Sequence, residues 1–148
     1  MLLFFDILNG LILAFLFVKA VLIYPKLPNK IPVHFDITLT PDAWGTKKMI
    51  FFLPTVALVL FVIFYLTSST PENTNFIVPI TLENQAWQFW LSELTSKILL
   101  LDILFLLFVL MKMMIVEHRK KYKPYAVGLF IMVFVILMVY GIVSYLYR

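Results

Sequence analysis

Four long stretches of apolar residues constrain this chain more than any other feature of its sequence. A helix needs about 20 mostly apolar residues to cross a hydrocarbon core roughly 30 Å thick. Backbone groups in lipid must also be hydrogen-bonded internally, which a helix achieves by itself. The strands of an outer-membrane barrel would alternate apolar and polar residues, and these stretches do not. They therefore predict four transmembrane helices, over residues 2–24, 49–67, 96–116 and 125–147.

The composition favours lipid over water as the solvent. Hydrophobic residues make up 63% of the chain and charged residues 14%, against about 45–50% and about 25% in soluble globular proteins. A small soluble domain leaves much of its surface exposed and could not bury so many apolar side chains. We therefore expect an all-α fold, an integral membrane bundle of four helices in which residues 1–148 form one membrane domain.

The basic residues predict the orientation of the bundle. Ten of the twelve lie in or beside the first and third loops, which leaves Lys97 and Arg148 at the other end. The positive-inside rule places both basic loops in the cytoplasm and both termini outside. The link over residues 117–123 is short, so the third and fourth helices should be antiparallel neighbours. The ten basic residues are Lys19, Lys26, Lys30, Lys47, Lys48, Lys112, Arg119, Lys120, Lys121 and Lys123.

The end of the second loop, about residues 85–95, predicts an interfacial segment. Trp87, Trp90, Leu91 and Leu94 have the spacing of one helical face. Because tryptophan favours the membrane interface, we expect a short helix lying on the outer surface. The simplest role for such a segment is to anchor the third helix.

The loop over residues 25–48 has the most distinctive sequence. Three prolines hold its first part extended, since proline fixes φ and disfavours helix in the preceding residue. Residues 33–38 then alternate apolar and polar, which predicts an extended strand with its polar side chains on one side. Residues 40–42 predict a turn or a helix start, and Gly45 is available for an unusual backbone angle. The polar positions of the strand are His34, Asp36 and Thr38.

The same loop contains eight residues in a recognisable spacing: Leu27, Pro28, Ile31, Pro32, His34, Asp42, Gly45 and Lys47. At these positions it resembles the uncharacterised N-terminal domain of SdpI-type bacterial membrane proteins. Their pattern is roughly LPxxIPxHf, then a glycine, then xDxxgxK. That glycine falls at Leu39 here, and the resemblance covers about residues 2–67. The second half of full SdpI proteins is not recognisable in residues 68–148.

The resemblance implies a multi-pass protein of the bacterial inner membrane. The best-known role in that family is immunity against a secreted peptide toxin, combined with toxin sensing and sequestration of a regulator at the membrane. The alternative is a small accessory subunit of a larger membrane complex. Gly10-x-x-x-Ala14 in the first helix would allow close contact with another helix. Expected partners are therefore the lipid bilayer and a peptide toxin, a regulator or a larger complex, with no nucleic acid.

The loop also holds the candidate ligand-binding residues. His34, Asp36 and Asp42 could form a metal or proton site, because imidazole and carboxylate groups are common ligands and titrate usefully. Their spacing matches no established metal motif. In the simpler interpretation His34 and Asp42 brace the loop against the membrane surface through hydrogen bonds. Lys47 joins the candidates through the family pattern.

Polar residues inside the predicted helices form a second candidate group: Asp6, Asn9, Asp102 and Lys112. A carboxylate at the centre of a membrane helix costs up to about 2.5–3.5 kcal/mol on insertion scales. Asp102 should therefore have a partner. Asp6 and Asn9 lie at a similar depth in the first helix, and Lys97 lies five residues from Asp102. The pairing expected is with Asn9 or Lys97. A structural pairing with one of them is one interpretation, and a proton or ligand path is the other.

The sequence does not support an enzymatic function. The chain has neither a serine-hydrolase elbow nor a phosphate-binding glycine loop, and no paired catalytic carboxylates. It also has no cysteine, which excludes disulfides and thiolate metal sites. We therefore expect a non-enzymatic protein without catalytic residues, metal or cofactor.

Overall fold

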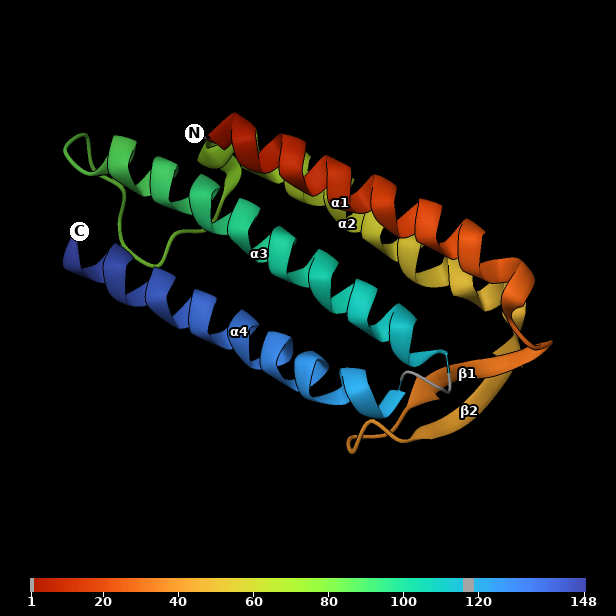
Figure 1. Ribbon diagram of the computed structural model, residues 1–148. Coiled ribbons are helices and arrows are strands. Elements are labelled where there is room, and N and C mark those ends of the chain that lie inside the picture. Colours follow the sequence, from red (N-terminus) through yellow and green to blue (C-terminus); the bar gives the residue numbers. More distant parts are fainter. Residues whose placement is uncertain (1, 116–118) are drawn as a thin grey trace.

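The computed structural model describes residues 2–115 and 119–148 and contains the predicted helices. The long ones are α1 (Leu2–Ile23), α2 (Phe52–Ser68), α3 (Gln85–Met113) and α4 (Arg119–Leu146). Within the described residues, four helical spans are long and apolar enough to cross a membrane. The four helices run side by side along one direction (Figure 1). The predicted all-α membrane bundle is confirmed.

Helix α3 is the centre of the bundle. It packs against α1, α2 and α4, whereas α4 packs chiefly against α3. Both termini lie at one end of the bundle, and α3 and α4 are antiparallel neighbours as predicted (Figure 1). The main apolar core therefore forms between α1, α2 and α3, and its fully buried side chains include Leu16, Ala57, Leu104 and Met111.

The prediction of a separate interfacial helix over residues 85–95 is wrong. This segment is helical, but it continues without a break into α3, which has 29 residues. The buried Gln88 amide holds it upright against α4, donating to the backbone oxygens of Ser144 at 3.0 Å and Tyr147 at 3.1 Å. The Ser144 hydroxyl donates back to Gln88 Oε1 at 2.7 Å. At 1.5 Å per residue, the 29 residues of α3 span about 44 Å, which exceeds the hydrocarbon core by about two and a half turns.

Helix α4 begins earlier than the predicted residue 125. It starts at Arg119 and includes Pro124, so most of the predicted link 117–123 is helical. The missing N–H of Pro124 leaves the carbonyl of Lys120 without its helical partner. Lys120 is exposed in the first turn, where water can serve that carbonyl. The predicted end of the third helix at 116, and the first two residues of the link, lie outside the described residues.

The loop between α1 and α2 folds into a β-hairpin. β1 (Lys30–Phe35) pairs with the antiparallel β2 (Pro41–Thr46), and short 3-10 turns join them to the helices on both sides. The predicted strand over 33–38 therefore ends at Phe35. Residues 40–42 do not form a turn or a helix start, because β2 begins there. The hairpin lies across the end of the bundle opposite the termini (Figure 1).

Leu39 closes the hairpin turn in a left-handed conformation. Its φ is 56°, the one positive φ among the described residues, and its N–H donates to the Asp36 carbonyl at 2.8 Å. This is the position at which the family pattern has glycine, the residue that adopts such a φ without steric cost. For leucine the cost is roughly 1–2 kcal/mol. Packing of Leu39 on Val109, Met113 and Ala126 offsets that cost.

Two substitutions at Leu39 separate strain from packing. Leu39→Ala and Leu39→Gly both remove the packed side chain, but only glycine also removes the strain. We expect the glycine variant to be more stable than the alanine variant by about 1 kcal/mol. Unfolding titrations in mixed micelles measure the difference. Equal stabilities would mean that the turn relaxes to negative φ.

Gly45 has a different role from the expected one. No glycine in the described part of the chain has a positive φ. Instead, a Cβ built on Gly45 would lie 2.8 Å from Val33 Cγ1, closer than real side chains approach. Glycine is therefore required because the two strands and the following turn come together at this point.

Candidate functional site

The two ends of the bundle carry opposite charge. The hairpin and the start of α4, which carries Lys120, Lys121 and Lys123, lie at one end, and the termini lie at the other (Figure 1). The end with the termini has four carboxylates against two basic side chains, Lys97 and Arg148. It is therefore acidic, whereas the hairpin end is strongly basic. The four carboxylates are Asp6 near the start of α1, Glu72 and Glu83 before α3, and Glu93 in α3.

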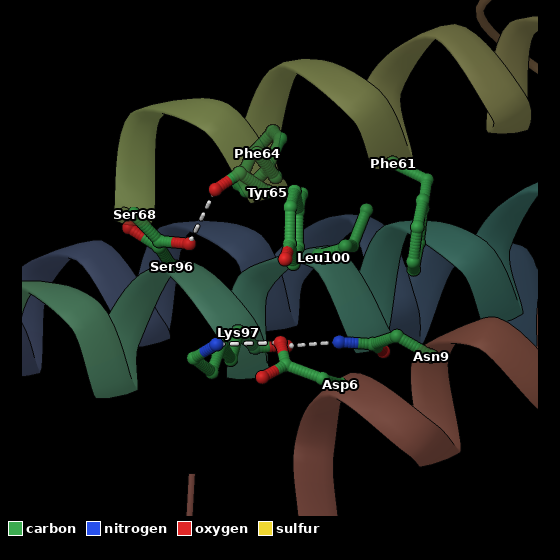
Figure 2. A pocket seen from close by; sticks show the side chains of 9 residues that line it. All are labelled: Asp6, Asn9, Phe61, Phe64, Tyr65, Ser68, Ser96, Lys97 and Leu100. Carbon is green, nitrogen blue, oxygen red and sulfur yellow. Dashed lines mark hydrogen bonds and ion pairs between the residues drawn. The ribbon is translucent and has the colours of Figure 1, made fainter. Parts of the chain in front are cut away.

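A buried lysine is the centre of the acidic end. The Lys97 side chain is 7% exposed, and its Nζ donates to Asp6 Oδ1 at 2.5 Å. Glu93 Oε1, one helical turn earlier, lies 3.3 Å from the same Nζ. Asn9 Nδ2 donates to the Lys97 backbone oxygen at 3.1 Å. Figure 2 shows Asp6 and Asn9 reaching from α1 toward Lys97 on α3. Two carboxylates therefore share one ammonium group.

Three members of this cluster, Asp6, Asn9 and Lys97, line a small pocket between α1, α2 and α3 (Figure 2). The cavity is 10 Å³, close to the least volume that holds one water. Asn9 Oδ1 is fully buried and has no hydrogen-bond partner among the described residues. The pocket thus combines the ion pair of Asp6 and Lys97 with a buried acceptor, and Glu93 adds a second carboxylate beside it. Its other lining residues are Phe61, Phe64, Tyr65, Ser68, Ser96 and Leu100.

The predicted pairing of Asp102 with Asn9 or Lys97 is wrong. Asp102 is 8% exposed, and its Oδ2 has no hydrogen-bond partner within the described residues. Five residues separate it from Lys97, so the two side chains leave α3 on different faces; helical neighbours are three or four apart. Asn9 bonds to the backbone of Lys97 instead. Lys112, the remaining intramembrane candidate, places its Nζ 5.5 Å from the centre of the Phe108 ring.

On the hairpin, His34 and Asp42 are brought together. His34 Nδ1 lies 2.5 Å from Asp42 Oδ1, so a hydrogen bond links the two strands. Both side chains are well exposed, at 68% and 47%. This is the arrangement that the bracing interpretation requires. Asp36 lies at the turn and does not join them, and the described residues contain no group of three or more side chains that could hold a metal ion.

Asp36 organises the turn. Its Oδ1 accepts from the Thr38 hydroxyl at 2.7 Å and from the Thr40 N–H at 2.8 Å. The hydrogen bond from Thr38, followed by that from Thr40, lowers the pKa of Asp36 below its ordinary 3.8. Lys123 at the start of α4 also contributes to this lowering. The carboxylate is therefore stabilised in its ionised form.

Acid should release this turn. Because the pKa of Asp36 is lower in the folded chain, its ionised form contributes stability above about pH 4. That contribution is lost as the pH falls through the lowered pKa. NMR of the Thr40 amide proton in micelles should show a titration with a midpoint below 3.8, and Asp36→Asn should abolish it. A midpoint at or above the ordinary value would contradict the assignment.

Lys47, the last hairpin candidate, fixes the base of the hairpin. Its backbone N–H donates to the Asn29 carbonyl at 3.0 Å, and its Nζ lies 5.0 Å from the centre of the Tyr24 ring. A cation over an aromatic face adds a modest attraction. Lys47 therefore connects β2 to the end of α1.

The comparison with protein families locates one known module. Residues 11–58 match the model of a family described as a domain of unknown function (DUF1648). The match runs from α1 through the hairpin into α2. The curated proteins and the solved structures give no match. The chain is therefore a four-helix membrane protein in which part of α1, the hairpin and the start of α2 are similar to DUF1648.

Proposed function

We propose that this protein is a non-enzymatic binding protein of the bacterial inner membrane, with an SdpI-like role in sensing or resisting a secreted cationic peptide. The DUF1648 match covers most of the segment in which the sequence resembles SdpI-type proteins. The positive-inside rule puts the acidic end outside, where a secreted ligand would arrive. The absence of catalytic motifs from the sequence favours binding over catalysis.

The observation that carries this proposal is the shared ammonium of Lys97. Asp6 and Glu93 both lie within ion-pair distance of it, so the cluster keeps one uncompensated negative charge. A basic side chain of a ligand would neutralise this charge by a charge-assisted hydrogen bond. The surrounding carboxylates of the acidic end would increase the rate of encounter with a cationic peptide. Such a ligand needs no deep cavity, because Glu93 is about one-third exposed.

Deletion should sensitise the host cell to the cationic peptide fraction of its spent culture medium. Wild-type protein should restore protection. Glu83→Gln should restore most of it, because it removes an exposed carboxylate of the same end that affects only the rate of encounter. Glu93→Gln should restore it only in part, because this variant keeps the pair between Lys97 and Asp6 but loses the excess charge. Survival is counted at matched membrane levels of each variant. A deletion strain that is as well protected as its parent contradicts the proposal.

One observation favours the second candidate function, an accessory subunit. Gly10 and Ala14 of α1 face away from the bundle: a Cβ on Gly10 would meet nothing within 4 Å, and Ala14 is exposed. Small residues on an outward face allow another helix to approach closely. Purification from native membranes in mild detergent should then yield a stoichiometric partner that Gly10→Leu loses. A lone monomer would count against this candidate.

A further inference from the structure

An apolar groove of 520 Å³ opens beside the hairpin turn, at the basic end of the bundle. All of its lining side chains are apolar. Ile37 at the tip of the turn is fully exposed. Contact of this apolar side chain with water would be unfavourable. The groove residues of α4 lie within about three turns of the start of that helix, and those of α3 lie within about two turns of its end. Its walls include Ile37 and Leu39 from the turn, Leu106 and Leu110 from α3, and Val127 and Phe130 from α4.

Lys123, a basic residue of α4, lies one helical turn before the groove residue Val127. Lys123 precedes Val127 by four residues and Phe130 by seven, so all three share one face of α4. Lys123 is also near enough to the turn to act on the carboxylate of Asp36. It forms no ion pair with any residue that the structure describes. Asp36 accepts two hydrogen bonds at Oδ1 within the turn and forms no hydrogen bond with Lys123 in the described structure, so the ammonium group of Lys123 is available to an anion.

We propose that this groove binds an anionic phospholipid, with an acyl chain against the apolar walls and the phosphate on Lys123. The arrangement of a cation one turn above an apolar groove, near the end of the helices, matches the order of phosphate and acyl chain in a leaflet. A basic side chain near the membrane surface attracts anionic headgroups, whichever way the protein is oriented.

The walls favour an acyl chain over a peptide. The backbone groups of Leu106, Leu110 and Val127 lie inside helices and bond within them. An extended peptide would find no partner there for its own N–H and C=O groups, which is costly in lipid. An acyl chain has no such groups. The site lies at the opposite end from the Lys97 cluster, so the two proposals stand or fall separately.

Native mass spectrometry of the purified full chain, released from nanodiscs of mixed phosphatidylglycerol and phosphatidylcholine, tests the proposal. Wild-type protein should retain phosphatidylglycerol in preference. Lys123→Gln should reduce this preference about fivefold, as expected for one lysine near an anionic headgroup. Lys26→Gln removes an exposed lysine from the same end, away from the groove, and should leave the preference unchanged.

A second variant tests the groove itself. Val127→Trp places a large side chain on its wall and should reduce retention of both lipids, with the helical circular dichroism unchanged. Equal retention of the two lipids by the wild type would overturn the proposal. An equal loss in Lys26→Gln would also overturn it, because the basic end would then act without a specific site. So would a dimer or a bound peptide that Val127→Trp removes.

Discussion

Replacing Lys97 with methionine should destabilise the bundle by about 3 kcal/mol, the cost typical of removing one partner from a buried ion pair. Methionine keeps most of the packing volume but leaves Asp6 and Glu93 facing one another without a cation. Both carboxylates are only about one-third exposed or less. Titration from dodecylmaltoside into sodium dodecyl sulfate measures the free energy of unfolding. Lys30→Met, at an exposed lysine, is the matched control and should change it by less than about 0.5 kcal/mol.

Neutralising the two carboxylates that are left without a cation should recover much of the lost stability. In the Lys97→Met background, Asp6→Asn and Glu93→Gln remove both negative charges while preserving size. We expect the triple variant to recover at least half of the lost stability, because a neutral cluster costs less in lipid than two unpaired charges. If Lys97→Met is as stable as the Lys30→Met control, the ion pair does not hold α1 to α3.

Gly45→Ala should destabilise the hairpin by about 2 kcal/mol, within the range for overpacking a close contact. The added Cβ would lie 2.8 Å from Val33 Cγ1 and 3.3 Å from Met49 Cγ. Faster hydrogen exchange of the strand amides and a lower free energy of unfolding report the loss. Gly128→Ala is the control, because nothing lies within 4 Å of a Cβ at that position.

Shortening the opposing side chain should rescue the Gly45 variant. Val33→Ala removes both methyl groups that the new Cβ would meet. Gly45→Ala combined with Val33→Ala should therefore be less destabilised than the two single changes predict together. This non-additivity is expected only for residues in direct contact. Wild-type stability of Gly45→Ala alone would contradict the close approach of the strands.

The long helices could be predicted from the sequence because each must supply about 20 apolar residues to cross lipid. The start of α3 could not, since it depends on the contact between Gln88 and Ser144 on α4. The hairpin could not be predicted from the sequence either. Alternation over residues 33–38 does not reveal that the Asp36 side chain turns the chain back and begins a second strand.

The candidate sites show the same division. The bond between His34 and Asp42 agrees with the bracing interpretation of the sequence. Asp102 was the wrong partner for Lys97, because a spacing of five residues separates helical faces. Glu93 was overlooked, although its spacing of four residues from Lys97 is the usual signal of a helical ion pair. The ion pair between Asp6 and Lys97 depends on how α1 packs on α3, and no local sequence pattern predicts that packing.

We propose that the bundle crosses the membrane four times with its acidic end outside. The chain has no cysteine, so single cysteines can be introduced without background. A membrane-impermeant maleimide should label Ser69→Cys, in the loop after α2, in intact cells. It should label Ala43→Cys, on the hairpin, only after the membrane is permeabilised. Labelling of both positions from the same side would contradict the four-span bundle. Labelling of Ala43→Cys alone in intact cells would show the opposite orientation, in which a secreted peptide could not reach the acidic end.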